Sequence, residues 1–528
     1  IAAPSSRRDL VLRPVTRPSQ SFPIVHPMVE HEHLDILIVG AGISGLGGAV
    51  HLKDRCPDST FAILEGRPDI GGTWDLFRYP GVRSDSDMHT LGFRFKPWKH
   101  EKSIADGPVI LDYLRETVAE NELAGHIRFG HQVADAQWSS IDARWTVTAT
   151  RTDPTTGTTE SVVLTCGFLF MCSGYYSYRD GYTPEFPGRE CFGGTIIHPQ
   201  KWPEDLDYAG KRVVVIGSGA TAMTLVPAMA DDAEHVTMVQ RSPTYVVSRP
   251  AHDVIANRLR RFLPSKLAYA IVRKKNVVRQ GLVYRKTRAD PDKVKNLLLS
   301  GVRAGLGPDY DIETHFTPSY NPWDQRLCLI PDGDLFKAIS SGKVSVVTDH
   351  IETFTETGIR LMSGVELGAD IIVTATGLNL VTLGEMDFVV DGEPVDFAKT
   401  WTYRGLGYSD IPNLVSTFGY VNASWTLKAD LTSEYVCRLL NHMADVGATR
   451  CTPRLRDEDV DMPSRPWIDD FPAGYMTRSL HLLPRQGDHA PWLNPQDYRR
   501  DVKMIRRGEI DDGVMCFDSP DQSSVTVA

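Results

Sequence analysis

The sequence predicts an α/β protein in which one kind of nucleotide-binding unit occurs twice. The first unit reads LDILIVGAGISGLGGAVHL over residues 34–52, and the second reads RVVVIGSGATAMTLV over residues 212–226. Each runs from an apolar strand pattern through a small-residue turn into a helical pattern, the context in which a G-x-G-x-x-G spacing is specific. The fixed positions are Gly40, Gly42 and Gly45 in the first unit, and Gly217, Gly219 and Ala222 in the second. Two Rossmann-like dinucleotide-binding domains are therefore expected.

The residue that ends each unit carries the opposite charge. Glu65 ends the first unit in the string FAILE, and Arg241, followed by Ser242, ends the second in HVTMVQRS. An acidic residue at this position can accept hydrogen bonds from ribose hydroxyls, whereas an arginine accommodates a 2′-phosphate. A pyrophosphate would lie at the helix N-terminus, which in the second unit includes Thr221. The sequence therefore predicts two dinucleotide sites, one of them for NADPH.

The composition is that of a globular enzyme and excludes several other classes. The 528 residues, 41% of them hydrophobic and 23% charged, suffice for two or three domains. The net charge of −10 argues against a nucleic-acid partner, and no apolar run reaches the roughly 18 residues of a membrane span. The eight cysteines form no C-x-x-C motif, so the sequence predicts no metal site and no redox dithiol. This cysteine pattern favours a cytoplasmic location.

The other expected elements follow in order along the chain. Helical periodicity at 107–125 precedes strand patterns at 143–174, which end in FLFMCSGYY. Helices are expected over 251–305, strands again over 358–377, and a strand followed by a long helix over 410–445. The segment after Thr452 is rich in proline and shows little periodicity.

This order predicts that the second nucleotide domain is inserted into the first. The chain would cross between the domains near Ser173–Gly174 and again near Ala375–Gly377, where small residues and a glycine end an apolar strand. The predicted segments are 1–27, a disordered or upstream extension; 28–175, the first part of the first domain; 176–375, the second domain with a helical insertion at about 251–320; and 376–528, the second part of the first domain and the C-terminal tail.

Two further strings carry a resemblance to a known family. In FGGTIIHPQKWP the fixed positions of the pattern F-x-G-x-x-x-H-x-x-x-W are Phe192, Gly194, His198 and Trp202. In GGTWDLFRYPGVRSD a second pattern is matched by Gly71, Gly72, Trp74, Tyr79, Pro80, Gly81 and Asp85. The sequence thus resembles the type I Baeyer–Villiger monooxygenases, a branch of the flavin-containing monooxygenases, over about residues 34–510. Strings such as YNPWDQRLCLIP are similar to a mycobacterial subgroup that activates thioamide prodrugs.

The resemblance implies FAD in the first domain and NADPH in the second. In this family NADPH reduces the flavin, and dioxygen adds to it as a peroxide that inserts one oxygen atom into a ketone, giving an ester or lactone. The same oxidant can act on sulfur in thioethers or thioamides. Three alternatives stay open: an N-hydroxylating enzyme, an ordinary flavin-containing monooxygenase, and a membrane-attached flavoprotein scaffold without activity. The physiological substrate and the oligomeric state stay open as well.

The resemblance also assigns the active-site residues. Arg326 aligns with the arginine that stands beside the oxidant, and Asp85 with the carboxylate that pairs with it. From spacing alone, the favoured interpretation of Arg326 is a surface or domain-interface salt bridge, and only the resemblance favours the active-site role. Many relatives have lysine where this chain has Gln325, so Arg241 and Ser242 are expected to hold more of the 2′-phosphate.

Two motif residues allow a second interpretation. Trp74 could stack near the flavin or be a buried core aromatic, and both can hold at once. His198 is interpreted as a linker residue that couples domain position to catalysis, not as an acid or base.

Residues 258–288 form an unusually basic stretch. They hold eleven Lys or Arg and no Asp or Glu, with apolar residues between them: Leu259, Phe262, Leu267, Ile271, Val272, Val277, Val278 and Leu282. We interpret the stretch as a helical insertion whose apolar face packs on the protein. The alternative is an amphipathic helix that gives peripheral contact with an anionic membrane.

Overall fold

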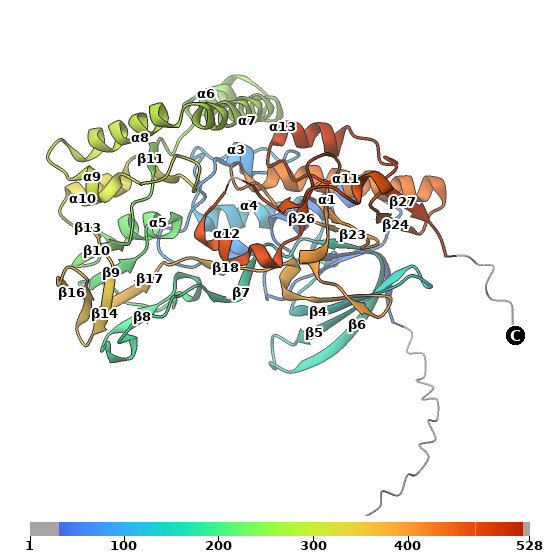
Figure 1. The fold of residues 1–528 in the computed structure, drawn as a ribbon, viewed down its shortest axis with the longest axis horizontal. Helices are drawn as coiled ribbons and strands as arrows, with labels where there is room; N and C mark the ends of the chain where they lie inside the picture. Colours follow the sequence, from blue (N-terminus) through green and yellow to red (C-terminus); the bar gives the residue numbers. More distant parts are fainter. Residues whose placement is uncertain (1–30, 470, 521–528) are drawn as a thin grey trace, which may run out of the picture.

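The computed structural model describes residues 31–469 and 471–520 (Figure 1). The prediction for residues 1–27 lies outside them. The first nucleotide unit consists of β1 (His33–Val39), α1 (Ile43–Arg55) and β2 (Phe61–Leu64). Strand β1 lies between β2 and β6 (Thr159–Met171) and is parallel to both, with Ile38 opposite Ile63 and Phe170. Strands covered on both faces read as continuous apolar runs, which is why the run ILIV at residues 36–39 of β1 does not alternate.

The first sheet is mixed. Its order is β20-β19-β4-β5-β6-β1-β2-β3, and β23 also pairs with β6. Antiparallel pairing joins β4, β5 and β6. Parallel pairing joins β6 to β1, β1 to β2 and β2 to β3, and β23 pairs in parallel with β6. The remaining strands are β3 (Ile127–Arg128), β4 (His131–Ser139), β5 (Arg144–Thr152), β19 (Asp387–Val390), β20 (Glu393–Pro394) and β23 (Leu414–Ser416).

The second nucleotide unit is built around a separate five-stranded parallel sheet of order β13-β10-β9-β17-β8. Strand β9 (Arg212–Ile216) leads through Gly217 into α5 (Ala220–Met229) and on to β10 (His235–Gln240). The sheet is completed by β8 (Thr195–Ile197), β13 (Val344–Thr348) and β17 (Ile371–Thr374).

The two connections between the sheets run side by side. Strand β7 (Tyr176–Gly181) leaves the first sheet after β6, and β18 (Leu378–Leu380) returns from the second after β17; the two pair antiparallel. After β18 the chain rejoins the first sheet through β19 and β23. This connectivity supports the nested arrangement inferred from the sequence, while the exact boundaries at residues 175 and 375 stay a proposal.

A helical segment follows β11 (Val246–Arg249) and covers one end of the molecule, at the top of Figure 1. It consists of α6 (Val254–Phe262), α7 (Ser265–Ala289), α8 (Pro291–Leu306) and α9 (Ile312–Phe316). Aspartate side chains cap three of these helices: Asp253 accepts from the Ala256 amide, Asp290 from the Lys293 amide and Asp311 from the Thr314 amide. The long helix α11 (Trp425–Val446) packs against α1.

The prediction that the apolar residues of the basic stretch pack on the protein is correct for Val272 and wrong for five others. The exposed ones are Phe262, Leu267, Ile271, Val278 and Leu282. The reason is that α7 packs through a different face, which contains Ala268, Tyr269, Arg273 and Asn276. Among the described residues, no helix is both long and apolar enough to cross a membrane.

The other elements fill the space between these parts. The helix expected at 107–125 ends earlier, as α4 (Gly107–Glu120), because Glu122 adopts φ +51°. The remaining helices are α2 (Thr73–Leu76), α3 (Met88–Leu91), α10 (Asp334–Ser340), α12 (Gly474–Ser479) and α13 (Tyr498–Asp501). The remaining strands are β12 (Cys328–Pro331), β14 (Ile351–Thr355), β15 (Gly358–Leu361), β16 (Glu366–Gly368), β21 (Thr402–Tyr403), β22 (Gly407–Tyr408), β24 (Arg450–Pro453), β25 (Arg465–Pro466), β26 (Arg485–Gln486) and β27 (Met515–Asp518).

Candidate active site

A cavity of about 810 Å³ is lined by residues of both nucleotide units. The first unit contributes the turn after β1, the end of β2 and the segment 71–86. The second contributes the start of α5 and the segment before β12. The predicted site residues among its lining are Gly40, Gly42, Glu65, Gly72, Trp74, Asp85, Thr221 and Arg326.

The first glycine turn fits a dinucleotide because its backbone leaves no room for side chains. Gly40 has φ +103°, and a Cβ there would lie 2.7 Å from the carbonyl oxygen of Cys172. A Cβ on Gly45 would lie 1.9 Å from the carbonyl oxygen of Gly40, so α1 packs directly onto the turn. Gly42 is the N-cap of α1 and receives no side-chain cap. The helix N-terminus therefore faces the cavity as a backbone anion site.

Glu65 ties the end of β2 to this turn. It is 4% exposed, and its carboxylate accepts from the amide of Ala41 at 2.7 Å and from that of Arg67 at 3.0 Å. Burial raises the pKa of Glu65 above its ordinary value. Each carboxylate oxygen keeps a further lone pair, so Glu65 can also accept from a ligand hydroxyl that enters the cavity.

The second glycine turn has the same geometry. Gly217 has φ +133°, and a Cβ there would lie 2.3 Å from the carbonyl oxygen of Ala375. Ala222 is fully buried, whereas Gly219 has open space at its Cβ position. Arg241 and Ser242 follow β10 as exposed residues, and the Ser242 carbonyl accepts from the Ser218 hydroxyl at 3.2 Å. Of the predicted NADPH-binding residues, Thr221 lines the cavity, whereas Gly217, Gly219, Arg241 and Ser242 lie outside its lining.

Arg326 and Asp85 meet in the cavity. Nε of Arg326 lies 2.9 Å from Oδ2 of Asp85, and both side chains are about a third exposed, at 32% and 34%. The charge of Asp85 raises the pKa of the Arg326 guanidinium above its ordinary value, so the cation persists at every working pH. The pair joins the two domains and lines the cavity, and its part in catalysis stays a prediction.

The comparisons with known proteins agree with this geometry. A family model described as flavin-binding monooxygenase-like matches residues 99–285, and one described as an NAD(P)-binding Rossmann-like domain matches residues 38–102. The FAD-containing monooxygenase EthA of Mycobacterium tuberculosis (strain ATCC 25618 / H37Rv) is 57% identical over 487 residues, which cover 92% of this chain and 98% of the relative. The putative FAD-containing monooxygenase MymA of the same strain is 50% identical, over 92% and 98%.

The chain belongs to the FAD-containing monooxygenases. Solved structures share its fold: an oxidized steroid monooxygenase bound to NADP has a TM-score of 0.73 at 24% identity, over 92% of this chain and 100% of that one. The open crystal structure of cyclohexanone monooxygenase has a TM-score of 0.72 at 20% identity, with the same coverage. The family resemblance, the α/β fold with its Rossmann-like domains, the enzyme class and FAD as a cofactor are thereby confirmed.

In this monooxygenase, the residues that match the pattern F-x-G-x-x-x-H-x-x-x-W lie outside the cavity lining. Phe192 is buried under the second sheet, and a Cβ on Gly194 would lie 2.4 Å from the carbonyl oxygen of Asp370. Trp202 packs, half-buried, against the core of the second domain. Nε2 of His198 lies 3.0 Å from the carbonyl oxygen of Gly377, and burial lowers the pKa of His198. His198 therefore connects the end of β8 to the second chain crossing, as a linker residue would.

The sequence interpretation missed an aromatic wall in the monooxygenase cavity. Tyr175 stacks on Trp425, with ring centroids 4.9 Å apart and an interplanar angle of 10°. Nε1 of Trp425 donates to the hydroxyl of Ser44 at 2.7 Å, and the hydroxyls of Tyr175 and Tyr176 contact each other. Burial raises the pKa of Tyr175, so its hydroxyl stays protonated. A clue in the sequence is the run SGYYSY at the first predicted crossing.

The position of Trp74 is compatible with both of its proposed roles, and stacking near the flavin stays a prediction. It is half-buried, packs against the core of the first domain and also lines the cavity. Next to it, the buried carboxylate of Asp75 is paired with Arg67 and Arg78, which fixes the start of the segment that leads to Asp85.

Proposed function

We propose that this monooxygenase uses FAD and NADPH to insert one atom of dioxygen into ketones, giving esters or lactones, and to oxidise sulfur in thioethers or thioamides. The observation that carries the proposal is the ion pair of Arg326 with Asp85 in a cavity lined by both nucleotide units. Enzymes of this fold include ones named for cyclohexanone and for polycyclic ketones. When bound, FAD supplies the activation of dioxygen.

The first unit has the features needed to hold FAD. The turn at Gly40 and Gly42 would receive the pyrophosphate at the N-terminus of α1. Glu65 would accept hydrogen bonds from ribose hydroxyls, with its carboxylate already oriented by the amides of Ala41 and Arg67. Gly72 and Trp74 line the same cavity and would border the ring system.

The second unit would hold NADPH. Gly217, Gly219 and Thr221 form the turn for its pyrophosphate, and Arg241 with Ser242 lies where a 2′-phosphate would sit. Gln325 replaces a lysine common in the family, so Arg241 is the principal cation for this phosphate. We infer that preference for NADPH over NADH depends mainly on Arg241.

Arg326 acts as a fixed cation beside the reacting oxygen atoms. A guanidinium keeps its charge and presents several donors in a rigid plane, so it stabilises negative charge that develops next to it. Asp85 orients that plane through its contact with Nε, and the terminal nitrogens would face a substrate carbonyl oxygen. The aromatic wall of Tyr175 and Trp425 excludes water from the same space and offers an apolar surface to a ketone.

The proposal is tested by offering the holoenzyme linear, cyclic and aryl ketones, a thioether, a thioamide and an alkylamine with NADPH and air, and identifying the products. We expect an ester or lactone from at least one ketone and a sulfoxide or S-oxide from a sulfur compound, both lost in Arg326→Ala. Exclusive formation of a hydroxylamine would favour the N-hydroxylating alternative. Absence of any oxygenated product, together with absence of flavin reduction by NADPH, would favour a scaffold.

A further inference from the structure

The outer face of α6 and α7 combines exposed apolar side chains with exposed cations. The apolar members are Val254, Ile255, Phe262, Leu267, Ile271, Val278 and Leu282, each at least 43% exposed and Phe262 at 76%. The exposed cations that we assign to this face are Arg258, Arg261, Lys266, Lys274, Arg285 and Lys286. We call these residues the α6–α7 face. Isolated exposed leucines are ordinary on a protein surface, but a contiguous set on two adjoining helices marks an interaction site.

The exposed apolar residues of α7 form one stripe. Leu267, Ile271, Val278 and Leu282 are separated by four, seven and four positions, which places them on the same side of a helix with 3.6 residues per turn. Lys274 and Arg285 fall within the same stripe. Long basic side chains can lay their methylene stems along an apolar surface and keep the charge in the headgroup region.

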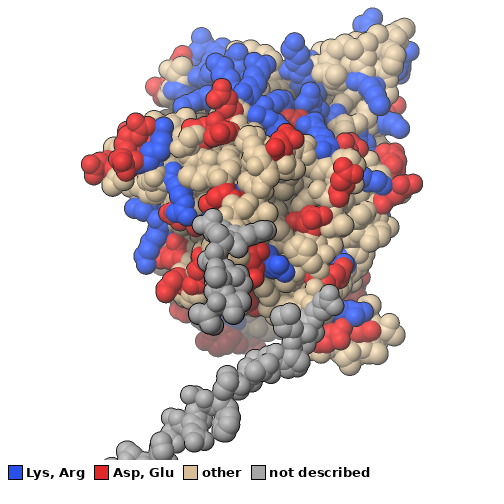
Figure 2. Space-filling view, turned by 90° about the vertical axis from the view of Figure 1, so that its right-hand side faces the viewer, with Lys and Arg blue, Asp and Glu red and all other residues tan. Residues whose placement is uncertain are grey.

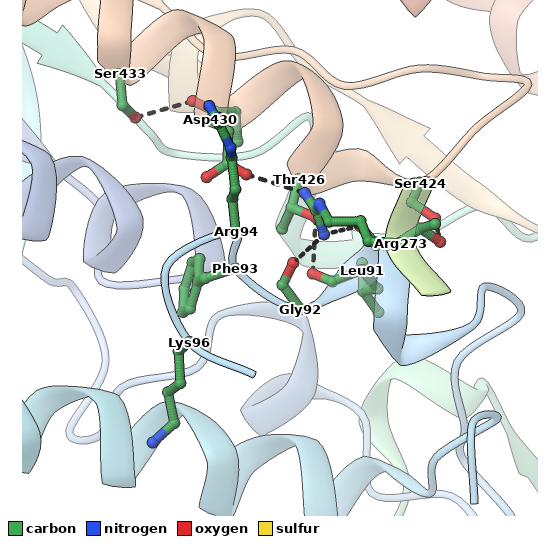
Figure 3. A network of polar contacts seen from close by, with 12 residues as sticks. Leu91, Gly92, Phe93, Arg94, Lys96, Arg273, Ser424, Thr426, Asp430 and Ser433 are labelled. Atoms are coloured by element: carbon green, nitrogen blue, oxygen red, sulfur yellow. Dashed lines mark hydrogen bonds and ion pairs between the residues drawn. The ribbon is translucent and has the colours of Figure 1, made fainter. Parts of the chain in front are cut away.

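The opposite side of α7 is fixed by buried polar contacts (Figure 3). Arg273 donates to the carbonyl oxygens of His89, Thr90 and Gly92 at 3.0, 3.1 and 2.7 Å, and it pairs with Asp430 of α11 at 3.0 Å. Nδ2 of Asn276 donates to Oδ1 of Asp87 at 2.9 Å. Rotating α7 to bury the stripe would break these contacts and leave the buried Asp430 carboxylate without its guanidinium partner, so the stripe must face outward.

The charge of this face departs from that of the chain. Residues 254–289 contain no Asp or Glu, although the whole chain has a net charge of −10. Lys and Arg gather along the top of the molecule in Figure 2, the end at which Figure 1 places α6 and α7. Among the described residues, Lys275 pairs with Asp253 and Arg288 with Asp324, but the six cations of the face form no ion pair within 4.0 Å.

We propose that the α6–α7 face docks the enzyme on the surface of an anionic lipid bilayer. Basic residues near such a surface attract it electrostatically, and large apolar side chains insert at the headgroup boundary. A nucleic acid would leave Phe262 and the apolar stripe unused. A second copy of this chain would bring like charges together across the contact, which disfavours pairing of the two faces. The occupant that matches both charge and apolarity is therefore an anionic membrane.

The test measures flotation of the full-length holoenzyme with vesicles. Vesicles of equal parts phosphatidylglycerol and phosphatidylcholine are compared with vesicles of phosphatidylcholine alone, at low and at high sodium chloride. We expect binding to the anionic vesicles, release by salt because exposed charges are screened over about 10 Å at 0.1 M, and at least tenfold weaker binding to the neutral vesicles. Absence of binding to anionic vesicles at low salt would overturn the proposal.

Two variants with equal charge change locate the surface. Arg258, Arg261, Lys266 and Lys274 are replaced by Gln in the first, and four exposed cations elsewhere, Arg144, Lys211, Lys337 and Lys343, are replaced by Gln in the second. Each basic residue near an anionic bilayer contributes roughly fivefold to binding, so the first variant should bind at least a hundredfold more weakly. The second should bind within about twofold of the unchanged enzyme. Equal losses in both variants would contradict a specific face.

A third variant, Phe262→Ser with Leu267→Ser, removes apolar side chains without changing charge. We expect this variant to bind anionic vesicles more weakly than the unchanged enzyme at the same salt concentration. The rate of flavin reduction by NADPH should stay unchanged. Light scattering in the absence of vesicles tests the alternative occupant, a second copy of this chain. If the unchanged enzyme forms a larger species that this variant converts to a smaller one, the face is a contact between copies and the membrane proposal is wrong.

Discussion

Arg326 and Asp85 form an ion pair that joins the two nucleotide-binding domains at the wall of their shared cavity, with Nε 2.9 Å from Oδ2. Asp85 lies in the segment that follows the first unit, and Arg326 lies just before β12, after the helical segment. The carboxylate orients the guanidinium and also ties the domains together. A change at Asp85 is therefore expected to affect chemistry more than cofactor binding.

We predict that Asp85→Asn slows oxygenation while leaving NADPH binding nearly intact. Asparagine keeps the size of the side chain but removes the charge that holds Arg326. Losing the ion pair that orients the cation should lower kcat, but by less than loss of the cation itself. Arg326→Ala should cost more, about 10²–10³ in kcat, as for removal of a donor that stabilises developing negative charge. Product formation and NADPH oxidation are measured separately, which gives kcat for oxygenation and the KM for NADPH. A rise in the KM for NADPH as large as the fall in kcat would contradict this division of roles.

We predict that Arg241→Ala raises the KM for NADPH by tenfold or more and leaves the KM for NADH unchanged. The side chain is exposed at the end of the second unit, and loss of a charged hydrogen-bond donor to a phosphate corresponds to about 1.5–3 kcal/mol. Arg189→Ala, which removes another exposed arginine of the same domain, serves as the control. An unchanged ratio of the two KM values in Arg241→Ala would refute the assignment.

Glycine substitutions test the first nucleotide turn. We predict that Gly45→Ala destabilises the protein by about 1–3 kcal/mol or more and lowers its FAD content, because the new Cβ would lie 1.9 Å from a backbone oxygen of the turn. Gly301→Ala in α8 is the matched control, since its Cβ would have no neighbour within 4 Å among the described residues. That substitution should stabilise by about 0.5–1 kcal/mol. Thermal unfolding and flavin absorbance of the purified variants measure both effects.

The nucleotide units were predictable because their signals are local. Gly40, Gly45 and Gly217 occupy backbone positions that the strand–turn–helix pattern itself requires, and the structure explains each by positive φ or close approach. The pairing of Arg326 with Asp85 was predicted from the family resemblance and not from the spacing of residues. The stacking of Tyr175 on Trp425 was not predictable, because the two residues are distant in sequence and no periodic pattern links them.

The orientation of α7 illustrates the same limit. Its sequence has apolar residues on more than one side, so periodicity alone cannot tell which face is buried. The buried face is selected by Arg273, whose guanidinium finds carbonyl oxygens and Asp430 in a distant part of the fold. Arg273 is thus buried and Phe262 exposed, although arginine is usually exposed and phenylalanine usually buried.

The pH dependence of stability should contain a contribution from His489. Its hydrogen bonds to Asp459 and Asp488 raise the pKa of His489 above its ordinary value of about 6.5. A histidine whose pKa is raised in the folded state stabilises fully below its unfolded pKa, and the stabilisation is lost as pH rises through the folded pKa. We therefore predict that His489→Gln lowers the unfolding temperature at pH below about 6.5 and has little effect well above the folded pKa. An effect that is the same at all pH values would contradict this.

The last prediction concerns the buried ion pair that orients α7. Arg273→Met should destabilise the protein by about 3–5 kcal/mol, because it leaves the carboxylate of Asp430, which is 4% exposed, without its guanidinium partner. The neighbouring Lys274→Met is the control: its side chain is exposed, and the change should stay within about 0.5 kcal/mol. Replacing both partners, with Arg273→Met and Asp430→Leu, should recover part of the loss, since an apolar pair avoids the unpaired buried charge. Thermal unfolding of the four proteins measures the series. Asp430→Leu could instead lower the stability of the Arg273→Met variant further, by as much as an independent core substitution does. In that case the carboxylate left without its guanidinium partner is not the cause of the loss.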